Sequence, residues 1–225
     1  MKLEPREYQK AIFQSIMEKG NMLVILPTGL GKTLIAFMLI ENKMKEGKCL
    51  FLAPTKPLVK QHFNSILATL DINPDLITIV TGEIPKKKRP ALYEKQIILS
   101  TPQTIKNDLM TGTLQDPSQF SLCVFDEAHR AIGNYAYTLV AERMKDKALV
   151  VGLTASPGGD KARITKILSN LFIANVEIRT KHEADVAPYV QNIESNWIET
   201  SLTPDLKSIK SQLDALSSPL ARKLA

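Results

Sequence analysis

Six short apolar runs recur along the chain, and segments with helical periodicity separate them. The runs cover residues 22–26, 49–53, 76–80, 96–100, 122–126 and 148–153. Between them, residues such as Leu58, Val59, His62, Phe63 and Ile66 share one helical face, and the last helix before residue 180 is expected at about 160–172. Continuous apolar strands joined by helices indicate parallel strands that are buried on both faces. We therefore expect an α/β fold with a mainly parallel sheet and helices on both faces.

The composition sets the size of the core and narrows the class of protein. Of the 225 residues, 44% are hydrophobic and 23% are charged, which suits one full core and is unlike a disordered segment. No apolar run approaches the ~20 residues that a membrane helix requires. The first ten residues contain no signal-peptide core, so we expect an intracellular protein, cytoplasmic and nucleoid-associated in a prokaryote or nuclear in a eukaryote. The formal net charge of +6 is compatible with a polyanionic partner but does not establish one.

The two cysteines are interpreted as small buried hydrophobes. Cys49 and Cys123 each lie inside an apolar run, and they form neither a CxxC pair nor a metal-ligand spacing. Because a reducing compartment is expected, we do not expect a disulfide between them.

The sequence pattern changes near residue 183. Residues 182–191 are polar and are interpreted as a segment that leaves the main domain. Residues 192–200 alternate like an edge strand, on which Trp197 is interpreted as a packing residue. Residues 203–218 then predict a helix, with apolar spacing at Leu206, Ile209, Leu213 and Leu216.

A glycine-rich loop, LPTGLGKT at residues 26–33, joins a predicted buried strand to a predicted helix. Gly29 and Gly31 let the backbone curl so that its N–H groups point inward, and the following helix adds the positive end of its dipole. Lys32 would then reach the β- and γ-phosphates of a nucleotide, and Thr33 would hold Mg²⁺. The loop departs from G-x-x-x-x-G-K-[ST] only at its first glycine, where Leu26 stands. The alternative, a chance glycine-rich turn, is disfavoured by the strand before it and the helix after it.

Two adjacent carboxylates, Asp126 and Glu127, end the apolar run LCVFD. In an enzyme with a phosphate loop, Asp126 would hold Mg²⁺ through water, and Glu127 would orient and polarise the attacking water. Taken alone, such a pair is more simply explained as a helix N-terminal cap. The phosphate loop earlier in the chain reverses that preference, which makes Lys32, Asp126 and Glu127 the candidate catalytic residues.

Together with the motifs around it, this site resembles that of a DEAH-type superfamily 2 helicase. The sequence is most similar to the archaeal Hef helicase and its eukaryotic relatives of the Fanconi anaemia group M class. In chain order, the matching motifs are PREYQ (5–9), LPTGLGKT (26–33), APTKPLVKQ (53–61), TGE (81–83), STPQT (100–104), DEAHRAIGNYAY (126–137), LTASPG (153–158) and DVAPYVQ (185–191). The resemblance implies the first RecA-like P-loop motor domain of such a protein, with ATP and Mg²⁺ as cofactors.

The resemblance also implies roles for individual residues. Arg6 and Gln9 would read adenine, with Thr33 and Asp126 on the metal side. The rest of the nucleotide would be bound by Pro27, Thr28, Gly29, Leu30, Gly31, Lys32 and Thr33. Nucleic-acid backbone contacts would come from Thr55, Lys56, Gln61, Thr81, Gly82, Thr101 and Gln103. Without the resemblance, ordinary loop polarity is the preferred explanation of Thr55, Lys56, Gln61, Thr101 and Gln103. His129, Thr154 and Ser156 would couple the nucleotide to the nucleic acid, but on chemistry alone His129 is as well explained as a histidine bonded within its loop.

Motifs IV to VI, which this family carries on a second motor domain, have no counterpart in the sequence. That domain supplies an arginine finger, so a second motor domain of the same protein is an expected partner. In Hef-like proteins a helical insert lies between the two motor domains, and no nuclease signature of the kind at the far end of archaeal Hef appears here. We therefore divide the chain into a RecA-like ATP-binding domain at 1–183, an exit segment with an edge strand at 184–202, and the truncated start of a helical insert at 203–225.

The predicted function is that of an ATP-dependent DNA helicase or translocase that acts on branched or forked DNA in replication-fork repair. We expect no membrane among its partners. An RNA-directed motor or RNA sensor of the same superfamily would share every motif, and the subfamily wording favours DNA only by resemblance. As an isolated fragment, the chain is expected to be a nucleotide-gated nucleic-acid-binding module with little turnover. The basic run at 86–89 is interpreted as a solvated helix end in preference to a phosphate grip.

Overall fold

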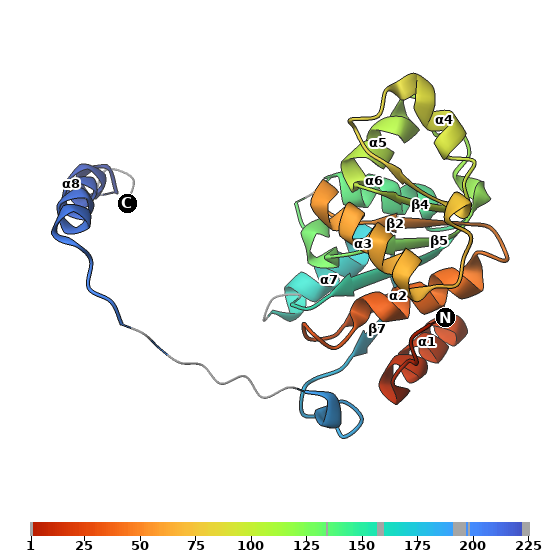
Figure 1. The fold of residues 1–225 in the computed structure, drawn as a ribbon, viewed down its shortest axis with the longest axis horizontal. Coiled ribbons are helices and arrows are strands. Elements are labelled where there is room, and N and C mark those ends of the chain that lie inside the picture. The colour runs from red at the N-terminus through yellow and green to blue at the C-terminus, as the bar shows by residue number, and fades with distance from the viewer. Residues whose placement is uncertain (1, 134, 157–159, 191–196, 198, 222–225) are drawn as a thin grey trace. The chain divides into compact units, whose positions relative to one another are not determined.

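A parallel sheet of seven strands forms the centre of the computed structural model (Figure 1). The structure describes residues 2–133, 135–156, 160–190, 197 and 199–221. Neighbouring strands all run parallel, in the order β3-β4-β2-β5-β6-β1-β7. The α/β fold with a parallel sheet is therefore confirmed. The strands are β1 Met22–Ile25, β2 Lys48–Leu52, β3 Ile77–Val80, β4 Ile97–Ser100, β5 Phe120–Phe125, β6 Leu149–Thr154 and β7 Asn175–Ile178.

Helices cover both faces of the sheet because alternate residues of each strand point to opposite sides. On β1, Met22 and Val24 belong to one buried apolar cluster, and Leu23 and Ile25 belong to another. The first cluster includes residues of α1 (Glu7–Lys19), α2 (Lys32–Lys43) and α3 (Lys56–Thr69). The second includes residues of α5 (Pro102–Met110), α6 (Tyr135–Met144) and α7 (Lys161–Leu171). Burial on both faces explains why the strands appear in the sequence as continuous apolar runs.

Short elements occupy many of the connections. One of them, η4 (Ala128–Ala131), is a 3₁₀ turn directly after the acidic pair that follows β5. The others are the helix α4 (Arg89–Leu92) and the 3₁₀ turns η1 (Pro74–Leu76), η2 (Lys86–Lys88), η3 (Pro117–Gln119) and η5 (Ala187–Tyr189).

The edge strand β7 was not predicted from the sequence. It pairs with β1, with Met22 opposite Asn175. Its four residues, NVEI, contain only two apolar side chains, and none of the four is fully buried, so no continuous apolar run marks it. The strand expected at 192–200 lies largely outside the described residues. Within that range Trp197 is 96% exposed, so the expectation that it packs on a strand is wrong.

The exit segment packs against the α/β domain as far as Val190. Val186 is fully buried in the cluster formed with α1 to α3, and Val190 packs against the same cluster. The ring of Tyr189 lies 4.6 Å from the guanidinium carbon of Arg6. The chain accordingly divides into a compact unit that ends at Val190 and a second unit that follows it.

The second unit contains α8 (Pro204–Ala221), where the sequence predicts a helix at 203–218. Three apolar residues at helical spacing, Leu206, Ile209 and Leu213, are each at least half exposed. An exposed apolar stripe is typical of a helix that packs against a further element. Its assignment to a helical insert stays a prediction.

Both cysteines are free and fully buried, as predicted. Burial raises the pKa of both thiols, that of Cys49 to about 12. Thiols with a raised pKa are poor nucleophiles at neutral pH. Over the part of the chain that the structure describes, no helix has both the length and the apolar character needed to cross a bilayer.

Candidate nucleotide and nucleic-acid sites

The predicted site motifs divide into two groups along the carboxyl edge of the sheet, where ligands bind in open parallel α/β sheets. The glycine loop follows β1 and the acidic pair follows β5, with β6 between these two strands. The motifs expected to contact nucleic acid follow β2, β3 and β4, which are consecutive neighbours in the order β3-β4-β2. The predicted nucleotide residues and the predicted nucleic-acid contacts therefore lie next to each other on one edge of the sheet.

The glycine loop has the backbone geometry of a phosphate cradle. Gly29 and Gly31 have φ values of +83° and +73°, a region that residues with a Cβ rarely adopt. Gly31 is also the N-cap of α2, and a Cβ added there would lie 2.5 Å from Nε2 of Gln9. A side chain at position 31 would therefore displace Gln9 from the loop. The start of α2, a helix of 12 residues, provides free N–H groups and a positive dipole end for an anion.

The side chain of Lys32 is hydrogen-bonded to the glycine loop. Its ammonium donates to the carbonyl oxygen of Leu26 at 2.8 Å and to that of Pro27 at 3.4 Å. Burial lowers the pKa of this ammonium, while the charges of Glu127 and Asp126 act in the opposite direction. The lysine is thus held at the mouth of the loop between its carbonyls and the acidic pair.

Asp126 contacts His62, for which the sequence predicts only a place on the apolar face of a helix. Nε2 of His62, on α3, lies 2.9 Å from Oδ2 of Asp126, and both side chains are largely buried. The His62 ring also packs against Phe51, with 4.7 Å between ring centroids. Since the carboxylate accepts, the ring nitrogen donates, and the pair fixes the orientation of Asp126. Partners of this kind orient metal-binding carboxylates in proteins.

Glu127 has a strained backbone. Its φ of +51° places a non-glycine residue in the left-handed region, which costs of order 1–3 kcal/mol and is frequent at active sites. Oε2 of Glu127 lies 3.2 Å from Nδ1 of His129, and the same nitrogen lies 3.0 Å from Oγ1 of Thr154. Two of the three predicted coupling residues, His129 and Thr154, are therefore brought together beside Glu127. The third, Ser156, is exposed and has no such contact with a described residue.

The adenine motif is connected to the glycine loop through its side chains. The hydroxyl of Tyr8 donates to the carbonyl of Leu30 at 2.7 Å, and Nε2 of Gln9 donates to the same carbonyl at 3.2 Å. Oε1 of Gln9 accepts from the backbone N–H of Arg6 at 2.8 Å. Gln9 is 2% exposed, so in this structure its amide braces the loop. Arg6 is the more accessible of the two predicted adenine contacts.

A cavity of about 420 Å³ lies beside the loop, within the ~300–1,000 Å³ of typical ligand sites. Five of the predicted nucleotide residues line it, and Pro27, Thr28, Leu30, Lys32 and Asp126 do not; the five are Arg6, Gln9, Gly29, Gly31 and Thr33. Residues of α3 form another part of its lining, namely Gln61, His62, Ser65 and Thr69.

Gln61 lies apart from the other predicted nucleic-acid contacts on α3. It lines the cavity beside the glycine loop, whereas Thr55 and Lys56 at the start of α3 line a different cavity. Gln61 comes five positions after Lys56, and at 3.6 residues per turn it points to another side of the helix.

These features fit a nucleoside triphosphate with Mg²⁺. The loop offers N–H groups and an ammonium to phosphate oxygens, and Thr33 and Asp126 offer the hard oxygen ligands that Mg²⁺ prefers. Mg²⁺ is usually bound by one or two protein ligands together with substrate phosphates, which matches the sparse donor set at this edge.

The polar residues after β2 and β4 meet at a second cavity, of about 260 Å³, whose lining includes Thr55, Lys56, Thr101 and Gln103. Thr55 and Thr101 are the N-caps of α3 and α5, so the N-termini of two helices lie at this cavity. Lys56 is paired with Glu83 at 2.6 Å, an exposed ion pair of the kind worth about 0–1 kcal/mol. Of the two predicted contacts after β3, Thr81 is buried and Gly82 is exposed, and neither lines this cavity.

The basic run at 86–89 has two different parts. The lysines at 86–88 are exposed, as the interpretation as a solvated helix end requires, but Arg89 is buried and this part of the interpretation is wrong. The guanidinium of Arg89 donates to Asp108 on α5 at 2.6 Å and to the carbonyl of Ile84 at 2.8 Å. Tyr93 donates to the other oxygen of Asp108 at 2.6 Å. This network attaches the loop after β3 to α5.

We expect the replacement His62→Ala to weaken the Mg²⁺ dependence of nucleotide binding. Loss of a residue that orients a metal-binding carboxylate typically costs about 10–100-fold in metal affinity or activity. The measurement is the Mg²⁺ titration of a fluorescent ATP analogue bound to the chain, where the midpoint should move to higher Mg²⁺. His62→Gln, whose amide N–H can take the place of Nε2, should recover most of the shift. An unchanged midpoint for His62→Ala in a folded protein would contradict this role.

Comparison with known proteins gives consistent matches. The family described as type III restriction enzyme, res subunit, matches residues 2–159. A putative ATP-dependent RNA helicase of Methanocaldococcus jannaschii is 43% identical over 91% of this chain and 26% of its own length. The ATP-dependent DNA helicase MPH1 of Vanderwaltozyma polyspora is 38% identical over 98% of this chain and 22% of its own length. The chain thus spans about a quarter of the length of these curated relatives.

A solved structure agrees with this assignment. The Hef helicase domain of Pyrococcus furiosus is 42% identical, with a TM-score of 0.79 over 97% of this chain and 48% of that one. This chain therefore belongs to the family described as type III restriction enzyme, res subunit, and its relatives include helicases of the Hef and Mph1 type.

Proposed function

We propose that the chain is the ATP-binding motor domain of an ATP-dependent DNA helicase or translocase that acts on branched or forked DNA in replication-fork repair. The observation that carries this proposal is the sheet edge on which the phosphate loop and the acidic pair lie next to a separate polar cavity. The similarity to Hef and to DNA helicases of the Mph1 type supports DNA as the substrate. Such a protein would work at the nucleoid in a prokaryote or in the nucleus in a eukaryote.

In this proposal ATP and Mg²⁺ occupy the cavity at the glycine loop. Residues 27–33 bind the phosphates, Thr33 and Asp126 hold the metal ion, and Arg6 packs near adenine. Glu127 orients the water that attacks the γ-phosphate. His129 and Thr154 transmit the nucleotide state, since Nδ1 of His129 lies 3.2 Å from Oε2 of Glu127 and 3.0 Å from Oγ1 of Thr154.

The nucleic-acid strand lies along the loops after β2, β3 and β4. Hydroxyls, amides and helix N-termini in these loops suit phosphate oxygens, and such contacts carry no base information. A second motor domain of the same protein would close over the nucleotide. The division at residue 183 and the assignment of residues 203–225 to a helical insert belong to the same proposal.

An RNA-directed motor is the alternative, because the relative from Methanocaldococcus jannaschii is described as a putative RNA helicase. The ATPase activity of a longer chain that includes the second motor domain distinguishes the two. We expect forked DNA to stimulate turnover and duplex RNA at equal phosphate concentration to have little effect. Stimulation by RNA alone would favour the alternative.

We further expect residues 1–225 to bind DNA through its backbone, with an affinity that falls steeply as salt rises. Each neutralised phosphate releases counterions, so two or three contacts give a slope of about −2 to −3 in a plot of log affinity against log salt. Fluorescence anisotropy with two forked DNAs of unrelated sequence provides the measurement. Equal affinities for the two sequences are expected. A flat salt dependence, or strong preference for one sequence, would count against backbone binding.

A further inference from the structure

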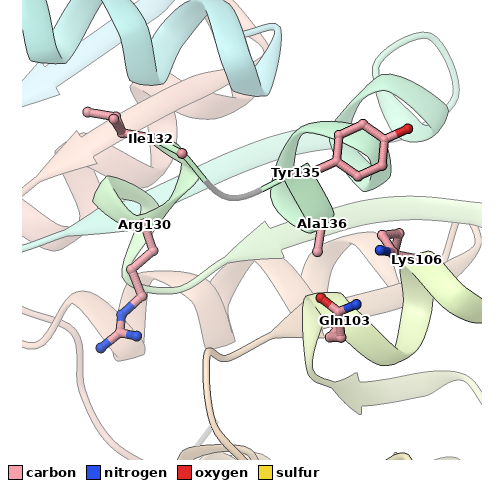
Figure 2. A pocket seen from close by; sticks show the side chains of 7 residues that line it. Gln103, Lys106, Arg130, Ile132, Tyr135 and Ala136 are labelled. Atoms are coloured by element: carbon pink, nitrogen blue, oxygen red, sulfur yellow. The ribbon is translucent and has the colours of Figure 1, made fainter.

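A basic recess next to the predicted nucleic-acid cavity has no role in the mechanism described above. Gln103, Lys106, Arg130, Ile132, Tyr135 and Ala136 line this recess of about 480 Å³ (Figure 2). Gln103 and Lys106 reach it from α5, whereas Arg130 extends from the turn after β5 (Figure 2). Gln103, Arg130 and Ala136 also line the cavity that contains Thr55, Lys56 and Thr101. The recess therefore continues the surface on which a nucleic-acid backbone is expected to lie.

Among the described residues, neither cation of this recess has an acidic partner. Arg130 is exposed, and its guanidinium has no ion pair or hydrogen bond to another described residue. The ammonium of Lys106 lies 5.5 Å from the ring centroid of Tyr135, and none of the described lining residues is acidic. Two cations that share a recess without a counterion fit an anion supplied by a ligand.

An aromatic surface accompanies these charges. Tyr135 is 65% exposed, so its ring is open to a ligand on this surface. An exposed ring beside cations is the combination with which proteins bind the sugars or bases of a nucleic-acid strand next to its phosphates.

Arg130 is also part of the turn that sets the conformation of Glu127. Glu127 is the N-cap of η4 (Ala128–Ala131), and the backbone N–H of Arg130, within η4, donates to the carbonyl of Glu127 at 2.9 Å. Glu127 has the left-handed φ of +51°. Such a conformation persists only where the surrounding contacts hold it. A ligand that fixes Arg130 therefore also restrains the backbone of Glu127.

We propose that the basic recess binds successive backbone phosphates of the nucleic-acid strand through Lys106 and through Arg130, which points away from Lys106 (Figure 2), and that the Arg130 contact positions Glu127 for hydrolysis. This inference rests on the proposed function, since it requires nucleic acid on this edge of the sheet. It adds Arg130 and Lys106 to the predicted nucleic-acid contacts. It also connects the bound strand to Glu127 through the backbone hydrogen bond of Arg130.

The test uses a longer chain that includes the second motor domain, with forked DNA as the probe. In Arg130→Gln, DNA affinity should fall, the log–log salt slope should become less steep by about one, and turnover at saturating DNA should stay below that of the unchanged protein. In Lys106→Gln, affinity and slope should fall similarly, but saturating DNA should restore full turnover. Arg130→Lys, which keeps the charge, should recover part of the affinity.

The control is Arg143→Gln, which removes an exposed arginine from the other end of α6 and should change neither quantity. Arg130→Gln with unchanged affinity and turnover would overturn the site. Reduced affinity with full turnover at saturating DNA would overturn the link to Glu127. Failure of the unchanged protein to bind any nucleic acid would instead overturn the proposed function.

Discussion

Residues 1–225 alone should bind ATP but hydrolyse it about 10³–10⁵-fold more slowly than a chain that continues through the second motor domain, which is the range attributed to an arginine finger. In the proposed function, Lys32 binds phosphate, Asp126 binds the metal ion and Glu127 orients the water, and all three residues lie in this chain. Of the described arginines near this edge, Arg6 packs on Tyr189 and Arg130 lines the basic recess. Neither is placed by a motif to act as the arginine finger, which this family carries on a second motor domain.

Steady-state ATPase of the two chains, with and without forked DNA, provides the comparison. DNA should stimulate the longer chain and have little effect on the shorter one. Unwinding should be absent from the shorter chain, because inchworm movement needs two domains that close and open on ATP. Equal turnover of both chains, abolished in each by Glu127→Gln, would mean that the first domain has a complete active site.

The central sheet and the nucleotide loop were predictable because both depend on local sequence. Strands buried on two faces give continuous apolar runs, and a phosphate cradle needs glycine where φ is positive, as at Gly29 and Gly31. β7 was not predictable in this way, because a four-residue edge strand has no apolar run of its own. Its position depends on pairing with β1, which lies about 150 residues earlier in the chain.

Contacts between distant residues explain what else was missed. His62 has the spacing of an apolar helix face, and no local pattern indicates that its ring meets Asp126, 64 positions away. Arg89 belongs to a run of four basic residues, yet it is the one that is buried, because it pairs with Asp108 on α5. In both cases a buried polar group is present because a partner satisfies it, and the partner comes from another element.

Replacement of Lys32 by alanine should strongly reduce ATP affinity. The ammonium of Lys32 now donates to two loop carbonyls, and it is half-buried near two carboxylates that favour its charged form. A bound triphosphate would offer it stronger acceptors within the same reach. Hydrogen bonds to charged groups are worth about 1.5–3 kcal/mol each, so Lys32→Ala should reduce ATP affinity by about 100-fold or more.

The same replacement should leave the fold intact, because Lys32 belongs to neither buried apolar cluster. We expect the free energy of unfolding to change by less than about 1 kcal/mol, as for other replacements outside the core. Titration of a fluorescent ATP analogue and urea denaturation measure the two effects separately. Lys45→Ala, an exposed lysine just beyond the other end of α2, is the matched control and should change neither. Retained ATP affinity in Lys32→Ala would disprove the phosphate site, and a large loss of stability would mean that the lysine serves the loop and not the nucleotide.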